Sequence, residues 1–217
     1  MKAITMNDDQ TGIPSPVIRV LGIWFVLAMG LVISGAFRPA QGVPPLGLVS
    51  MVLGPVLLYA VAWWRSDEFR HWVLSIDMRL LMATHAMRMV GMGFVFMWFY
   101  GQLPAVFALP AGLGDAMAAV GGLYLAILLY SGVRVSRAAV WRWNSFGLLD
   151  FIVAVGAGAL AAPGALLDFG GEATSLPMTV FPMAIIPAFF VPLFTLTHLA
   201  IYAQLKAGGP GTGNLSG

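Results

Sequence analysis

Long apolar segments recur along the chain, separated by short polar or proline-containing breaks. A helix needs about 20 apolar residues to cross the hydrocarbon of a bilayer. Six segments approach or exceed this length: residues 17–37, 46–64, 80–100, 114–133, 145–162 and 177–205. The pattern predicts an all-α fold, a polytopic bundle of about six transmembrane helices, with residues 17–205 as the transmembrane domain.

The regions outside these segments are short. Residues 1–16 and 206–217 are predicted to be cytoplasmic tails, the second of them flexible. One more apolar stretch, residues 103–113 (LPAVFALPAGL), is too short to span and contains two prolines. We expect it to lie in the interface or to re-enter the membrane, where protein or water would satisfy its backbone.

Composition supports a membrane environment. Only 9% of the residues are charged and 59% are hydrophobic, whereas a soluble domain carries about 25% charged residues. We therefore expect a lipid bilayer as the main partner and no nucleic acid. The chain has no cysteine, which excludes disulfides and thiolate chemistry. There is no GxSxG and no phosphate-binding glycine loop, so the sequence does not favour an enzyme.

Basic residues are distributed unevenly between the two predicted sides. Arg38 alone falls on one side, and Arg88 falls inside the third segment. The remaining nine fall on the side of the two termini: Lys2, Arg19, Arg65, Arg70, Arg79, Arg134, Arg137, Arg142 and Lys206. Because cytoplasmic loops carry the excess of Lys and Arg, we predict a bacterial inner-membrane protein with both termini in the cytoplasm.

A few polar residues fall inside the apolar segments, where each is costly and needs a reason. His85, Asp150 and His198 are each predicted roughly 9 to 10 Å from the basic side, on three helices. Arg88 shares a helix face with His85 and lies one turn deeper. Asp115 is expected near the opposite side, at the start of its helix, and not to join them.

Two interpretations need no bound cofactor. The polar residues can hold the helices together, or they can form a transport site. The preferred hypothesis is a small solute or proton-coupled transporter, or a channel-like protein. Histidine titrates near neutral pH, and Pro177, Pro182, Pro187 and Pro192 would break the sixth helix. The predicted substrate- or proton-binding residues are His85, Arg88, Asn144, Asp150, Thr195 and His198.

Two further alternatives remain open. His85 and His198 would suit the axial positions of a b-type haem, or, with Asp150, a zinc site of an intramembrane hydrolase. A non-catalytic membrane subunit, sensor or assembly factor is the other alternative. Small residues four apart, such as Gly30 with Ser34, allow close helix contact within a homo-oligomer or a membrane complex.

Four runs carry a resemblance: HAMRMVG (85–91), LPAVFALPAGLGDAMAAVGG (103–122), RWNSFGLLDFIVAV (142–155) and THLAIY (197–202). With them the chain resembles a group of uncharacterised bacterial multi-pass inner-membrane proteins over roughly residues 80–205. The resemblance implies a helical membrane fold and no particular activity.

Overall fold

The computed structural model describes residues 15–40, 45–163, 173–208, 212 and 215–216. Within these ranges the regular secondary structure is helical, apart from one pair of two-residue strands. The α-helices are α1 (Ser15–Ile33), α2 (Leu46–Arg65), α3 (Asp67–Ser75), α4 (Met78–Thr84), α5 (Met92–Phe99), α6 (Ala105–Tyr130), α7 (Arg137–Leu160) and α8 (Val191–Ala207). Two 3₁₀ stretches, η2 (His85–Gly91) and η3 (Leu176–Thr179), and a π-helix, η4 (Ile186–Phe190), complete them.

The all-α membrane class is confirmed. Five helices of the described chain are long and apolar enough to span a bilayer: residues 46–65, 78–99, 105–130, 137–160 and 186–207. The shorter apolar helix Val17–Ile33 lies within α1. Many large apolar side chains on these helices are exposed, among them Leu58 and Ile152. Their outward faces therefore fit contact with lipid.

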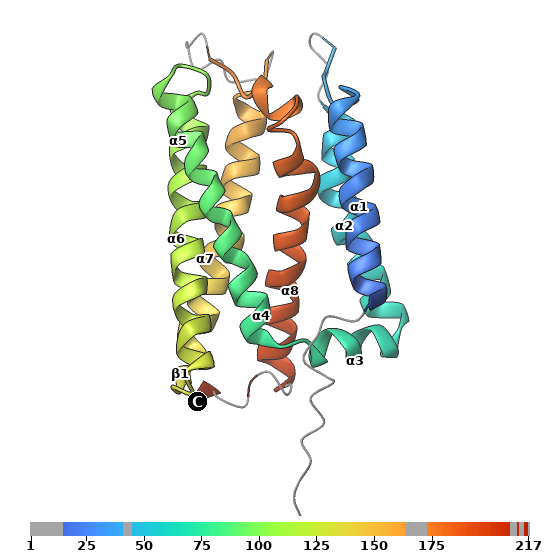
Figure 1. Cartoon of the computed structure of the whole chain (residues 1–217), viewed down its shortest axis with the longest axis vertical. Coiled ribbons are helices and arrows are strands. Elements are labelled where there is room, and N and C mark those ends of the chain that lie inside the picture. Colours follow the sequence, from blue (N-terminus) through green and yellow to red (C-terminus); the bar gives the residue numbers. More distant parts are fainter. Residues whose placement is uncertain (1–14, 41–44, 164–172, 209–211, 213–214, 217) are drawn as a thin grey trace, which may run out of the picture.

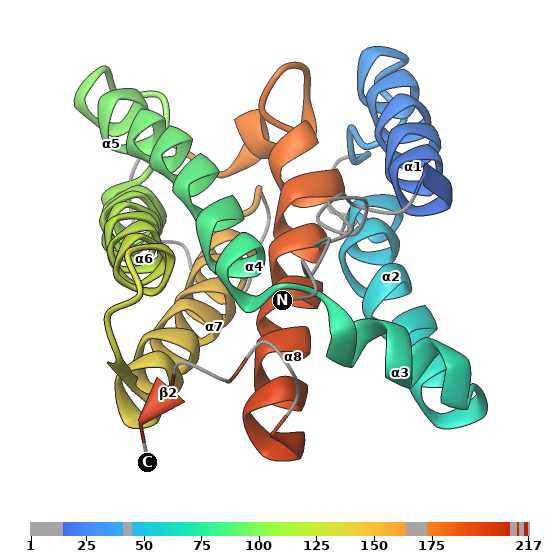
Figure 2. The ribbon, with the colours of Figure 1, turned by 60° about the horizontal axis from the view of Figure 1, so that its bottom comes forward.

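The spans form two groups joined by α8 (Figures 1 and 2). α4, η2 and α5 make one continuous span that packs on α6, and α6 packs on α7. α1 and α2 lie on the other side, where α1 contacts η4 and α2 contacts both η4 and α8. α8 therefore lies between the two groups and contacts helices of both.

The fourth predicted span was wrong at its start. α6 begins at Ala105, so the stretch expected to be interfacial or re-entrant is the first part of a 26-residue transmembrane helix. Pro104 precedes the helix, and Pro110 lies inside it. Transmembrane helices tolerate an interior proline because neighbouring groups satisfy the freed backbone carbonyl. The earlier start moves Asp115 from the helix end to roughly 15 Å inside the span.

The sixth predicted span was wrong over its first nine residues. Pro177 lies in η3, Pro182 in a turn and Pro187 in η4, so a spanning helix begins only at Ile186. Each proline removes a backbone donor and its ring clashes with the preceding turn. Three prolines at five-residue intervals therefore prevent a regular helix here. The fifth span also begins earlier than expected, at Arg137.

A short helix, α3, follows α2 at the end of the bundle that holds most of the basic residues, which we call the basic end. Ser66 caps it by accepting a hydrogen bond from Phe69 N, 3.1 Å away. Asp67 and Glu68 occupy its first turn, where carboxylates interact favourably with the positive end of the helix dipole. Gln204 of α8 donates to the carbonyls of Val73 and Ile76, at 3.0 and 2.9 Å. This side chain fixes the end of α3 against α8.

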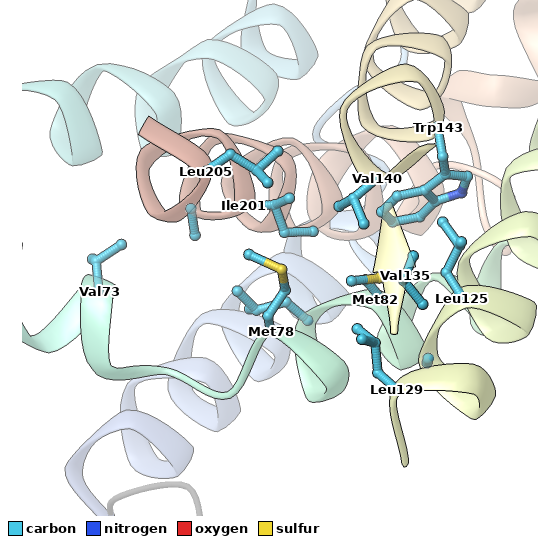
Figure 3. Packing of buried hydrophobic residues seen from close by; sticks show 13 residues of the cluster. Val73, Met78, Met82, Leu125, Leu129, Val135, Val140, Trp143, Ile201 and Leu205 are labelled. Atoms are coloured by element: carbon cyan, nitrogen blue, oxygen red, sulfur yellow. The ribbon is translucent and has the colours of Figure 1, made fainter. Parts of the chain in front are cut away.

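The largest apolar cluster lies near the same end, between α4, α6, α7 and α8 (Figure 3). Met78, Met82 and Ile201 are fully buried there, and Figure 3 shows their side chains facing one another. The loop from α6 to α7 contains β1 (Val135–Ser136), which pairs in parallel with β2 (Leu215–Ser216). Part of the region expected to be a C-terminal tail thus contacts the bundle, and residues 1–14 of the expected N-terminal tail lie outside the described residues.

Candidate functional site

The third span changes its winding where its polar residues begin. The Thr84 hydroxyl donates to the carbonyl of Leu81, 2.7 Å away, and this carbonyl is the one that His85 N would use in an α-helix. The backbone N–H of His85 bonds Met82 and Ala83 instead. Competition of this kind is common for Ser and Thr in helices. The backbone continues as a 3₁₀ helix to Gly91 and carries His85 and Arg88 into the bundle.

Arg88 is the centre of a buried polar cluster. Its side chain is 1% exposed. Its Nε donates to Asp115 Oδ1 at 2.7 Å and its Nη2 to Asp150 Oδ2 at 2.5 Å. Its Nη1 contacts the carbonyl of Gly147 at 3.2 Å and His198 Nε2 at 3.1 Å. One guanidinium therefore ties η2 to α6, α7 and α8.

Asp115 was expected near the opposite side, and this prediction was wrong. Its carboxylate, 13% exposed, forms an ion pair with Arg88. The error follows from the helix boundary, because α6 begins ten residues before Asp115. The ring of Phe151 also meets Arg88, with Cζ of the guanidinium 3.9 Å from the ring centroid. This contact is a cation–π interaction that shields the guanidinium.

His198 is held in one neutral tautomer. An arginine has only donors, so His198 Nε2 must accept the bond from Arg88. Its Nδ1 therefore carries the proton and donates to Asn144 Oδ1 at 2.8 Å. Asn144 Nδ2 donates to the carbonyl of His198 at 3.1 Å. Since both side chains are fully buried, this reciprocal pair fixes how the imidazole faces Arg88.

His85 lies beside His198 in the opposite tautomer. The Thr197 hydroxyl has one proton, which it donates to the carbonyl of Phe194 at 2.8 Å. The 3.0 Å contact between Thr197 Oγ1 and His85 Nε2 is then a bond donated by the imidazole. His85 Nδ1 is left as a buried lone pair without a hydrogen bond from the part of the chain that the structure describes. The centroids of the His85 and His198 rings lie 4.1 Å apart.

Glycines allow the helices to approach closely around the cluster. A Cβ at Gly147 would lie 2.6 Å from Cε1 and Nε2 of His198 and 3.1 Å from Nη1 of Arg88. A Cβ at Gly114 would overlap Asp150 Oδ1, and one at Gly91 would overlap the carboxylate of Asp115. Each glycine thus provides the space that one partner of the ion cluster occupies.

Five of the six predicted binding residues lie in this cluster: His85, Arg88, Asn144, Asp150 and His198. Thr195 does not join them, because its hydroxyl bonds the carbonyl of Val191 in its own helix at 2.8 Å. Thr197, two positions later, contacts His85 instead. Asp115 and Gly147 were missed as members. The sequence did offer a signal for Asp115, because it is the second acid inside the predicted spans. No sequence signal pointed to the carbonyl of Gly147.

The residues do not fit the proposed haem or zinc sites. Imidazole rings 4.1 Å apart leave no space for a haem between them, and His198 uses both ring nitrogens in hydrogen bonds. No group of three or more His, Asp or Glu residues in the described ranges is arranged to hold a metal ion. The cluster is therefore an ion and hydrogen-bond network built by the protein itself.

These features define a polytopic all-α membrane protein with a buried ionic cluster shared by four spans. The chain belongs to the family described as a domain of unknown function (DUF8737), whose model matches residues 44–206. This range includes every residue of the cluster and begins just before α2. No curated protein and no solved structure matches the chain.

Proposed function

We propose that the protein is a proton-coupled carrier of a small solute, and that the Arg88 cluster is its exchange site. The observation that supports the proposal is an imbalance of formal charge. One guanidinium (+1) pairs with two carboxylates (−2), so the cluster carries −1 when both acids are ionised. An uncompensated charge inside a bilayer is expensive, and a proton or a cationic solute neutralises it.

The neighbouring groups do not supply this positive charge. His198 accepts from Arg88 and His85 leaves Nδ1 without a donor role, so both imidazoles are neutral in this arrangement. Asn144 and Thr197 are uncharged. The remaining cations among the described residues lie at the two ends of the bundle, far along the helices from the cluster. One exchangeable positive charge is therefore the missing component of the site.

Irregular winding on two of the four spans supports movement at this site. η2 places Arg88 within a 3₁₀ stretch, and η4 is a π-helix just before α8. Mid-helix 3₁₀ segments and single π turns often mark functional hinges. A carrier needs such hinges, because the site must face one side of the membrane at a time.

Infrared difference spectroscopy tests the proton site without knowledge of the solute. We expect a protonated-carboxyl band to appear when reconstituted protein is taken from about pH 8 to about pH 5. Asp150→Asn and Asp115→Asn should each abolish the component of that band that comes from the cluster, since one acid and one guanidinium balance without a proton. Asp77→Asn is the matched control, because Asp77 pairs with Arg79 at the exposed end of the span.

Two results would contradict the proposal. If neither cluster variant changes the band relative to wild type, the acids remain ionised throughout and the network only holds the helices together. If Asp77→Asn removes the same component, the proton binds at the basic end instead.

We also propose that the basic end faces the cytoplasm of a bacterial inner membrane. Of the described basic residues outside the cluster, Arg38 lies at the opposite end, and eight lie at the basic end: Arg19, Arg65, Arg70, Arg79, Arg134, Arg137, Arg142 and Lys206. This bias sets orientation in short-looped membrane proteins. Alkaline phosphatase fused after Arg38 should be active and the same enzyme fused after Lys206 inactive; the reverse pattern would refute the orientation.

A further inference from the structure

An apolar groove opens on the outer surface of the bundle between α6 and α7. Its volume is about 300 Å³, near the lower limit for small-molecule sites. Its lining is Pro110, Leu113, Gly114 and Met117 from α6, with Phe146, Leu149, Asp150 and Val153 from α7. In both helices the lining positions follow the spacing i, i+3, i+4, i+7, so two matching stripes face each other over roughly 10 Å.

The groove faces the surroundings of the bundle rather than its interior. Leu149 is 57% exposed and Met117 is 62% exposed. Both residues lie in the middle of transmembrane helices, where the surroundings are acyl chains. A ligand that reaches this groove therefore comes from the membrane and has an apolar body.

Asp150 is the only charged residue in the lining, and it has an unused acceptor. Its Oδ2 accepts from Arg88, whereas Oδ1 accepts no hydrogen bond from the residues that the structure describes. Gly114 faces Oδ1, and only a glycine leaves room for it. The groove thus ends at Gly114 and at a carboxylate whose side chain is 6% exposed.

The charges around Asp150 decide what kind of ligand fits. Arg88 of η2 and Asp115 of α6 are the charged groups nearest to it. His198, a neutral ring, contacts Arg88, and the neutral ring of His85 lies beside His198. The formal sum is −1. An anionic head is therefore repelled, while a cationic head restores neutrality and donates to Oδ1.

We infer that this groove is the solute site of the proposed carrier, and that it takes an apolar organic cation, an ammonium with a hydrocarbon body, from the bilayer. The inference rests on the proposed function. The ammonium and the proton compensate the same negative charge, so binding of one releases the other. The only bond that breaks is the carboxyl O–H bond, and its proton passes to water when the ammonium arrives.

Octylamine binding to the full chain tests the inference in nanodiscs of phosphatidylcholine, which has no net charge to attract the probe. We expect saturable binding to wild type, about tenfold or more weaker in Leu149→Trp, whose indole fills the groove; tenfold is about 1.4 kcal/mol. Asp150→Asn should weaken binding similarly. Ile152→Trp is the matched control, because Ile152 is 65% exposed on α7 and outside the lining. It should bind like wild type.

The experiment separates this inference from the proposed function. In wild type, octylamine should also abolish the protonated-carboxyl band. If that band is present without amine but octylamine shows no saturable binding, the solute class is wrong and the proton site stands. If octanol displaces octylamine as well as unlabelled octylamine does, the groove holds an acyl chain and the inference fails. If Leu149→Trp changes the oligomeric state, the groove holds a second copy of the chain and the inference also fails. A binding curve unaffected by Leu149→Trp refutes the site.

Discussion

Replacing Arg88 by glutamine should destabilise the protein more than any other single change in the cluster, by about 3–5 kcal/mol. The substitution leaves Asp115 and Asp150 without a counter-charge in a bundle where the arginine side chain is only 1% exposed. Glutamine can still donate hydrogen bonds through its amide but supplies no charge. The effect is measured by heating the purified protein in mild detergent and recording the loss of monodisperse material as it unfolds.

Arg79→Gln is the control on the same span. Arg79 and Asp77 also form an ion pair, at 2.6 Å, but their side chains are 40% and 37% exposed. Exposed pairs contribute about 0–1 kcal/mol, so this variant should unfold close to wild type.

A compensated variant separates lost charge from lost packing. Arg88→Met combined with Asp115→Asn and Asp150→Asn removes all three charges and should recover most of the stability, because a buried ion group replaced as a whole is often close to neutral. If Arg88→Gln unfolds within about 1 kcal/mol of wild type, the cluster is hydrated and our description of it is wrong.

Gly147→Ala should produce the second-largest effect, through a single methyl group. The new Cβ would lie 2.6 Å from the His198 ring and 3.1 Å from Arg88 Nη1, far inside normal contact distance. Neither neighbour can move freely: Asn144 holds His198 and two carboxylates hold Arg88. Overpacking of this kind costs about 1–3 kcal/mol. The same unfolding assay should show the loss, with the acid-induced carboxyl band altered as well.

Gly156→Ala provides the matched comparison in the same helix. Nothing lies within 4 Å of a Cβ built at this position, and alanine is favoured over glycine inside a helix by up to about 1 kcal/mol. This variant should therefore be as stable as wild type or slightly more stable. Equal destabilisation by both substitutions would show that α7 tolerates no alanine in general, and that the close approach at Gly147 is not the cause.

The apolar pattern was sufficient for the fold class and for selecting five residues that the structure brings together in one cluster. Polar residues inside long apolar segments are few, and the cost of isolating any of them in lipid brings them together. This argument grouped His85, Arg88, Asp150 and His198 without knowledge of helix order. It also included Asn144, just before the fifth predicted segment, whose partner proved to be His198.

Prolines limited the rest of the prediction, because a proline has opposite effects at different positions. Pro110 lies within α6 without ending it, whereas Pro177, Pro182 and Pro187 keep the chain out of a regular helix until Ile186. Treating Pro110 as a break shortened the fourth span and displaced Asp115. Hydropathy alone could not reveal the winding either, since the 3₁₀ stretch begins beside a local hydrogen bond from the Thr84 hydroxyl.

The π turn at the start of α8 has a geometric consequence for the cluster. In η4 the backbone N–H of Val191 bonds the carbonyl of Ile186, five residues earlier, so this turn contains one residue more than an α-helical turn. Each residue of an α-helix corresponds to about 100° of rotation. If the extra residue moved past His198, the imidazole would swing by that angle about the axis of α8 and lose Arg88. The position of the extra residue in the π turn thus determines which face of α8 meets the guanidinium.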